Sequence, residues 1–170
     1  MTAETTTQST WLTQEAHDRL RTDLDEMKGA RRTEIVARIE AARDEGDLKE
    51  NGGYHAAKEE QGKLEARIRQ LDALLRTAFS GTNPSGDVVE QGCVVTVDYG
   101  DDDLETFLFA NRENATREQG KIVCNGQEMD VYSPESPLGQ AIDGRKPGEV
   151  VEFGERKVKV TITSVTPYDG

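Results

Sequence analysis

The sequence predicts an α+β protein in which an antiparallel α-helical coiled-coil hairpin precedes a small antiparallel sheet with one short helix. Up to Ser80 apolar residues recur at steps of three and four, the period of a packed helix face. Beyond residue 87 the period becomes two, as in strands with one buried face. A content of 34% hydrophobic and 32% charged residues in 170 suits two small cores better than one large core. We expect a flexible tail at 1–10, the hairpin at 11–80, a linker at 81–87 and the sheet domain at 88–170.

The first arm of the hairpin is predicted to begin near Thr13, which can cap a helix that carries Glu15 in its first turn. Residues 1–9 are polar and lack the basic start and apolar run of a signal peptide. Gly29, followed by Thr33, weakens the middle of the arm, because Gly costs about 1 kcal/mol relative to Ala inside a helix. We therefore expect a bend or a local break there. The predicted inner face consists of Leu20, Leu24, Met27, Arg31, Ile35, Ile39 and Ala42.

The second arm keeps its steps of three and four without a break, which is the pattern of a coiled-coil seam. Its seam consists of Tyr54, Ala57, Gln61, Leu64, Ile68, Leu71, Leu75 and Ala78. Each arm has roughly 25 to 30 residues, so at ~1.5 Å per residue the hairpin would be on the order of 40 Å long. The hexapeptide at 46–51, Gly-Asp-Leu-Lys-Glu-Asn, joins the arms and places Asp47 and Glu50 at the tip. Gly46 can open this turn with a positive φ, so that both carboxylates face the same way.

The second unit is predicted to be a compact antiparallel sheet. Alternating apolar residues place strands at 94–99, 105–110, 128–132, 149–153 and 157–165. Residues 136–142 suit one short helix, with Ser136 as N-cap, Pro137 at the first helical position and an end at 143–144. Residues 101–103, Asp-Asp-Asp, suit a solvated hairpin turn, because the regularly spaced oxygen ligands of a calcium loop are absent.

The charge of the chain restricts its partners. The net charge is −12, with 13 Lys and Arg against 16 Asp and Glu up to Ser80, and 8 against 17 beyond it. Because so acidic a surface repels phosphates, independent binding to DNA or RNA is not expected and a protein partner is favoured. No segment approaches the ~20 apolar residues of a membrane helix. Cys93 and Cys124 lack metal-ligand spacing, which indicates reduced thiols in a cytoplasmic protein.

The tip carboxylates have two interpretations. Asp47 and Glu50 can supply part of an Mg²⁺ shell, and because Mg²⁺ requires six oxygens, the pair alone would bind it weakly. If another active site offers the remaining oxygens, the pair could complete a two-metal site. Alternatively, both are ordinary polar residues of a helical turn, with Asp47 capping the second arm.

Other charged residues near the tip are also open to two interpretations. Arg43 and Lys58 flank the tip on opposite arms and could form a positive collar for RNA, or Lys58 could pair with Glu59 or Glu60 within its own helix. His55 and Glu59 lie four residues apart and could share a metal, but a surface hydrogen-bonding pair is favoured for one His with one carboxylate.

The tip and the short helix resemble one known family. Residues 42–51, ARDEGDLKEN, followed by 54–59, YHAAKE, are similar to the tip of the Gre transcript-cleavage factors of bacterial RNA polymerase. Residues 136–149 are similar to the family segment S-P-[IL]-[AG]-x-x-[LI]-x-G-x-x-x-G-[DE]. Residues 11–14, 51–54 and 132–134 resemble the actinobacterial branch of the GreA type.

The resemblance implies a function and a set of site residues. Asp47 and Glu50 would be the family's catalytic, metal-holding acids, which reach the polymerase centre through its secondary channel. The Mg²⁺ would be shared with that centre and not bound tightly by the isolated protein. Arg43 and Lys58 would lie near the 3′ segment of the nascent RNA, which the protein meets only within the complex. The loop Glu135, Ser136 and Pro137 would grip the polymerase rim.

The resemblance also implies an FKBP-like sheet domain without prolyl isomerase activity, in a cytoplasmic monomer that is no enzyme itself. Such a protein is a transcription elongation factor that stimulates cleavage of backtracked RNA by the polymerase. The rival hypothesis is a Gre-shaped protein that occupies the channel and modulates or inhibits polymerase without cleavage. One departure leaves room for this rival: Gly52 and Gly53 stand where many members of the family have Ala-Glu.

Overall fold

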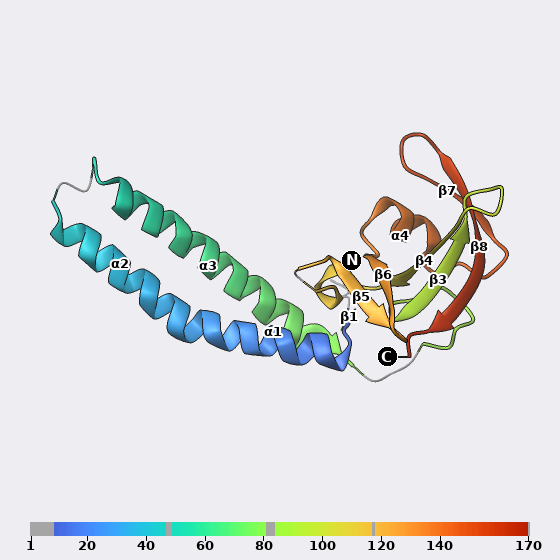
Figure 1. The fold of residues 1–170 in the computed structure, drawn as a ribbon, viewed down its shortest axis with the longest axis horizontal. Coiled ribbons are helices and arrows are strands. Elements are labelled where there is room, and N and C mark those ends of the chain that lie inside the picture. The colour runs from blue at the N-terminus through green and yellow to red at the C-terminus, as the bar shows by residue number, and fades with distance from the viewer. Residues whose placement is uncertain (1–8, 47–48, 81–83, 117, 170) are drawn as a thin grey trace, which may run out of the picture. The chain divides into compact units, whose positions relative to one another are not determined.

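The computed structural model describes residues 9–46, 49–80, 84–116 and 118–169. Asp47, most of the predicted tail and part of the predicted linker therefore lie outside the described residues. The chain divides into a helical unit, His17–Thr77, and a second unit formed by Met1–Ala16 with Ala78–Gly170. Figure 1 shows the helices of the one and the sheet of the other. Within the described residues, no helix is both long and apolar enough to cross a membrane.

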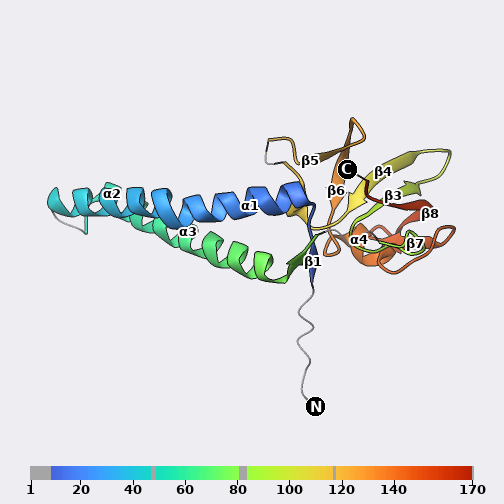
Figure 2. The ribbon, with the colours of Figure 1, turned by 90° about the horizontal axis from the view of Figure 1, so that it is seen from below.

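The helical unit is the predicted antiparallel hairpin. Its first arm contains α1 (Gln14–Glu26), a π-helix (Met27–Arg31) and α2 (Arg32–Asp44), and its second arm is α3 (Gly52–Thr77). Figures 1 and 2 both show α2 and α3 lying side by side. The π-helix contains Gly29, which confirms the predicted local break in the first arm.

The seam of the first arm changes register at the π-helix. The buried residues are Leu20, Leu24, Met27, Ile35, Ile39 and Ala42 on this arm, and Ala57, Leu64, Ile68 and Leu71 on α3. Leu20 and Ile35 are fifteen residues apart, one more than two heptads. A π-turn closes its hydrogen bond over one extra residue, so it absorbs that insertion and returns the apolar face to the seam. The prediction that Arg31 turns inward was wrong, because the extra residue leaves its side chain exposed.

Arg32 faces the other arm instead. Its Nε and one terminal nitrogen donate to the two carboxylate oxygens of Glu65 at 2.8 and 2.9 Å. The bidentate hydrogen bond to Arg32 holds the pKa of Glu65 below its usual value. Two further ion pairs join the arms, Lys28 with Asp72 at 2.8 Å and Arg38 with Glu60 at 2.6 Å. All three join the first arm to α3 and favour this register over neighbouring ones.

Deleting Gly29 is expected to stabilise the hairpin by about 1 kcal/mol, because it removes a mid-helix Gly and restores an unbroken heptad pattern. Deleting Ala37 is the matched control. That residue is also exposed, but its loss would rotate Ile39 and Ala42 out of the seam and cost about 2 kcal/mol or more. Thermal unfolding followed by circular dichroism compares the two variants. Equal destabilisation by both deletions would contradict the role assigned to the π-helix.

The second unit contains a six-stranded sheet in the order β5-β6-β4-β3-β8-β7. The elements are β3 (Cys93–Asp98), β4 (Leu104–Phe109), β5 (Lys121–Cys124), β6 (Gln127–Tyr132), α4 (Pro137–Ile142), β7 (Val150–Phe153) and β8 (Val158–Pro167). Leu138 and Ile142 of α4 share a buried core with Phe107 and Phe109 of β4. The short helix and the presence of a sheet thus agree with the sequence prediction.

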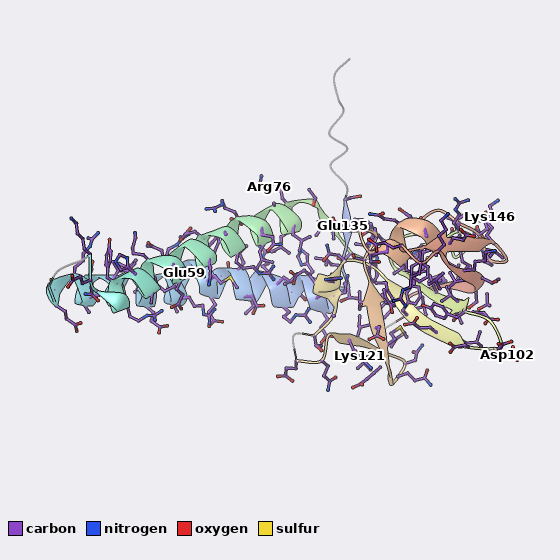
Figure 3. All side chains as sticks on the ribbon, turned by 90° about the horizontal axis from the view of Figure 1, so that it is seen from above. Glu59, Arg76, Asp102, Lys121, Glu135 and Lys146 are labelled. Carbon is purple, nitrogen blue, oxygen red and sulfur yellow. The ribbon has the colours of Figure 1, made fainter. Side chains whose placement is uncertain are left out.

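The sheet differs from the purely antiparallel one that was predicted. β6 pairs parallel to β4, because β5 turns the chain round between them. Sequence reasoning missed β5, although Asn125-Gly126 between two strand-like runs is a strong hairpin signal. Both residues have positive φ, 50° and 79°. The Asp-rich turn is confirmed, with Asp101 and Asp102 also at positive φ, and Figure 3 marks Asp102 there.

The segments directly before and directly after the helical unit belong to the second unit. Thr10 and Trp11 form β1 and pair in parallel with Ala78 and Phe79 of β2. The tail prediction was therefore one residue too long, since Thr10 is already in a strand. The predicted hairpin, 11–80, extends beyond the helical unit, because residues 11–16 and 78–80 belong to the second unit.

Asn114 holds the first of these strands. Its side chain is buried, accepts from the N–H of Thr13 at 2.8 Å and donates to the carbonyls of Trp11 and Asn111 at 3.2 and 2.9 Å. The Trp11 ring lies so close to Gly92, which has φ +93°, that a Cβ there would meet the ring at 2.8 Å. The segment that contains Trp11 is thus fixed by its buried contacts with Asn114 and Gly92.

Candidate functional site

The tip of the hairpin is built around Asn51. Its Oδ1 accepts from the N–H of Tyr54 at 3.1 Å, and its Nδ2 donates to the carbonyl of Ala42 at 2.6 Å. Asn51 is therefore the N-cap of α3 and at the same time satisfies a carbonyl in the last turn of α2. Asn51 thus occupies the N-cap position of α3, whereas Asp47, for which a capping role was the alternative, lies outside the described residues. One side chain thus joins the two arms at the tip.

At the turn between the two arms, the structure describes one of the two predicted tip acids, Glu50. α2 is followed by Gly46 at φ +134°, a conformation that favours glycine. Glu50 is exposed, and within the described residues it forms no ion pair. Asp47 lies outside the described residues, so the predicted carboxylate pair stays a prediction.

The described residues fit a partial Mg²⁺ site and no complete one. A carboxylate oxygen is the donor that Mg²⁺ prefers, and Glu50 presents one to solvent. Among the residues that the structure describes, no group of three or more His, Cys, Asp and Glu is placed to hold a metal. A metal at this tip would therefore need oxygen ligands from a partner.

The basic residues near the tip are exposed on opposite arms. Arg43 lies in the last turn of α2 and Lys58 in α3. The Lys58 ammonium donates to Oε1 of Gln61 at 3.1 Å, so Lys58 does pair within its own helix, but with a neutral amide and not with Glu59 or Glu60. A neutral partner leaves the charge of Lys58 available.

The favoured hydrogen-bonding pair of His55 with Glu59 was wrong, because each side chain has another partner. Glu59 pairs with Lys63 at 2.8 Å, and the hydrogen bond from that ammonium lowers the pKa of Glu59. A ring nitrogen of His55 lies 3.4 Å from the carbonyl of Lys49, and its ring meets Tyr54 edge-on at 5.6 Å. Both side chains are thus engaged with other neighbours.

Gly52 and Gly53 open α3, and neither has a positive φ. A Cβ on Gly52 would meet no atom within 4 Å. Replacing Gly52 with Ala is therefore expected to stabilise the hairpin by about 0.5 to 1 kcal/mol, because it restricts the unfolded chain without strain. The matched control is Gly46→Ala, which should destabilise it since φ +134° excludes a Cβ. Thermal unfolding by circular dichroism tests both, and a loss of stability with Gly52→Ala would contradict the expectation.

The predicted docking loop is rigid. Ser136 caps α4 by accepting from the N–H of Gly139 at 3.1 Å, and its hydroxyl donates to the carbonyl of Ser133 at 2.7 Å. Pro137 follows at the first helical position and is exposed, as is Glu135, which Figure 3 labels. The three residues thus form a fixed corner that is available to a partner.

A further polar cluster lies in the same unit and was missed from the sequence. Glu105 accepts from the hydroxyls of Tyr99 at 2.6 Å and Tyr132 at 2.7 Å, one on each carboxylate oxygen. Burial and the bond to Glu105 raise the pKa of Tyr132 to about 12. The cluster depends on the parallel pairing of β4 with β6, which no local pattern revealed.

The chain combines a coiled-coil hairpin that has an exposed acidic turn with a sheet domain that has a rigid loop. These two units define a class of proteins in which a helical hairpin presents polar groups. Residues 10–79 match the family described as "Transcription elongation factor, N-terminal", and residues 83–167 match "Transcription elongation factor, GreA/GreB, C-term". The chain belongs to the GreA/GreB family of transcription elongation factors. The resemblance inferred from the tip and the short helix is thus confirmed.

Full-length relatives agree with this assignment. "Transcription elongation factor GreA" of Saccharopolyspora erythraea is 52% identical over 169 residues, covering 96% of this chain and 98% of its own length. The protein of that name from Mycolicibacterium smegmatis is 51% identical over 172 residues, covering 98% and 99%. The crystal structure of GreA factor homolog 1 of Thermus thermophilus is 23% identical, covers 92% of this chain and 98% of its own and superimposes with a TM-score of 0.41. Because this TM-score is low, the family assignment does not rest on this structure.

Proposed function

We propose that this protein is a transcription elongation factor that binds bacterial RNA polymerase and stimulates cleavage of backtracked nascent RNA. The observation that carries the proposal is the tip, where Asn51 locks the two arms together and leaves Glu50 exposed. The protein acts in the cytoplasm as a monomeric accessory factor, and the polymerase supplies the hydrolytic centre. The hairpin enters the secondary channel while the loop at 135–137 grips its rim.

The tip residues would act as a set. Asp47 and Glu50 would hold an Mg²⁺ ion together with oxygens of the polymerase, and this ion would activate water and stabilise the leaving oxygen. Glu50 needs no rearrangement for this task, since its carboxylate is exposed and has no ion pair among the described residues. Arg43 and Lys58 would offset phosphate charge near the RNA 3′ segment.

A second candidate is a polymerase modulator that occupies the channel without promoting cleavage. Gly52 and Gly53 are the observation that favours it, because two glycines in the first turn of α3 weaken the helix behind the acids. The bonds of Asn51 to both arms oppose this weakening and favour the first proposal.

The test is to incubate the purified protein and Mg²⁺ with elongation complexes that have been stalled in a backtracked state. Shortened RNA that still extends when nucleotides return is the expected result. The same protein with free RNA is the control and should produce no cleavage, because two carboxylates form only part of an Mg²⁺ site. Binding to the complex without any shortening of RNA would favour the second candidate, and absence of binding would exclude both.

Replacing Pro137 with Ala is expected to weaken polymerase binding about tenfold, because it removes an exposed rigid ring from the docking corner. The thermal transition of the hairpin should not change, since the two sites lie in different units. Fluorescence anisotropy of labelled protein with polymerase measures the affinity. Unaltered affinity would show that the docking surface does not include this loop.

A further inference from the structure

Glu50 is held through its backbone rather than through its side chain. In the part of the chain that the structure describes, its exposed carboxylate forms no ion pair, so its direction is set by the backbone that carries it. Mg²⁺ requires near-ideal octahedral geometry, and a group that supplies one of its ligands is most effective when its position is fixed in advance. The contacts of the two neighbours, Lys49 and Asn51, therefore decide how Glu50 is presented.

His55 contacts the residue before Glu50. Its ring nitrogen Nε2 lies 3.4 Å from the carbonyl oxygen of Lys49, and because a carbonyl oxygen accepts, this nitrogen donates. The carbonyl belongs to the same planar peptide group as the N–H of Glu50. The contact therefore restricts the orientation of the peptide that leads into Glu50. The His55 ring is in turn held edge-on against Tyr54, with the ring centroids 5.6 Å apart.

Asn51 anchors the residue after Glu50 to both arms. Besides capping α3 and donating to the carbonyl of Ala42, it accepts the backbone N–H of His55 at its own carbonyl, at 3.2 Å. The Ala42 carbonyl also accepts from the N–H of Glu45 at 3.3 Å. The bond from Asn51 therefore joins the start of α3 to the turn that ends α2.

We infer that Asn51 and His55 are positioning residues, which hold the backbone on both sides of Glu50 so that its carboxylate is presented in one orientation. The inference rests on the proposed function, because it names the residues that prepare the tip for that function. Both side chains act through Glu50 and contact neither RNA nor metal. A merely structural role would weaken the hairpin when either side chain is lost, but would leave cleavage at saturating factor unchanged.

The first experiment separates the two bonds of the Asn51 side chain. Ser is as good an N-cap as Asn, but its hydroxyl ends one bond short of the amide nitrogen that donates to Ala42. Asn51→Ser should therefore lower the cleavage rate at saturating factor about five- to tenfold, the effect of one hydrogen bond. Its affinity for polymerase should stay within about twofold of the natural value, because the docking loop is unchanged.

Arg38→Met is the matched control for Asn51→Ser. It removes the ion pair with Glu60 at 2.6 Å, which also joins the two arms but does not involve the residues beside Glu50. Its cleavage rate should stay within about twofold of the natural protein, because exposed ion pairs contribute little. A loss of cleavage in Asn51→Ser that is no larger than the loss in Arg38→Met would overturn the role of Asn51.

The second experiment tests His55 with a pair of substitutions. His55→Phe keeps a ring beside Tyr54 and removes the donor nitrogen, and it should lower the same rate about threefold, because the contact is long and exposed. His55→Gln returns an amide nitrogen at the ε position and should recover most of the loss. Because Gln does not titrate, this recovery also excludes a role in proton transfer. Natural cleavage in His55→Phe, or a loss that His55→Gln does not restore, would overturn the role of His55.

A third measurement needs no polymerase. In the isolated natural protein, the backbone amide of Glu50 should have an NMR order parameter near the ~0.85 of a rigid backbone. Both Asn51→Ser and His55→Phe should lower it toward the ~0.6 of a flexible one, whereas Arg38→Met should leave it unchanged. An unchanged order parameter in the first two variants would overturn the inference, even if their cleavage falls.

The proposed function and this inference fail in different ways. If the natural protein neither binds polymerase nor stimulates cleavage, the proposed function fails and the positioning role fails with it. If the natural protein stimulates cleavage and both Asn51→Ser and His55→Phe match it, only the positioning role is excluded. Circular dichroism of each variant confirms that the hairpin has folded.

Discussion

Replacing Asp47 or Glu50 with Ala is expected to lower RNA cleavage by at least about 100-fold, because each change removes a carboxylate from a shared Mg²⁺ site. The double variant should be little worse than either single one, since groups that act as a unit are strongly non-additive. Polymerase binding should survive, so each variant should compete with the natural factor. Gel analysis of RNA from stalled complexes measures the cleavage.

Glu45→Ala is the matched control for this prediction. Glu45 is an exposed acid at the end of α2, two positions before Asp47 in the sequence, and it carries the same charge. Its loss should leave cleavage within about twofold, since the proposed site does not use it. Melting temperature should change little for Glu50→Ala, because Asn51 rather than Glu50 caps α3. Near-native cleavage by the double variant would exclude a metal role for the pair.

Replacing Asn114 with Ala is expected to destabilise the second unit by about 3 kcal/mol. The change leaves the buried carbonyl of Trp11 and the partly buried N–H of Thr13 without their partner, and each unsatisfied group costs about 1 to 3 kcal/mol. Trp11 is the one tryptophan of the chain and is buried beside Asn114. The fluorescence of Trp11 during urea unfolding therefore measures the loss of stability at the site of the substitution.

Asn111→Ala is the control for Asn114, since it removes a side chain of the same type that accepts one bond, from the N–H of Glu113 at 2.9 Å. Loss of this cap should cost about 1 kcal/mol. If the two alanine variants unfold at the same urea concentration, Asn114 does not hold the N-terminal strand as the hydrogen bonds indicate.

Features that depend on neighbours in the chain could be predicted from the sequence. The steps of three and four predicted the hairpin, and Ser136 with Pro137 predicted the start of α4. Thr13 was predicted to cap α1, and its Oγ1 does accept from the N–H of Ala16 at 3.0 Å. Each of these interactions joins residues at most four positions apart, so composition and spacing are sufficient to reveal it.

The register of the first arm could be predicted only in part from the sequence. Gly29 marked the place of the break, but the pattern of four-residue steps through Arg31 concealed the inserted residue. Whether Arg31 or Arg32 faces the second arm depends on how the helix closes its hydrogen bonds, and the ion pair with Glu65 favours the observed choice. The cap of α3 was missed although its bond from Tyr54 to Asn51 spans only three positions, whereas the second bond of Asn51, to Ala42 on the other arm, could be found only in the structure.

The sequence by itself determined the two-part architecture, the acidic tip, the short helix and the family, because all of these depend on local periodicity or on contiguous motifs. Only the tertiary structure decided the parallel pairing of β4 with β6, the place of Glu105 between two tyrosines and the anchoring of Trp11 by Asn114. These features join residues that lie many positions apart. Their partners are selected by burial and strand pairing in the folded chain, which leave no periodic trace in the sequence.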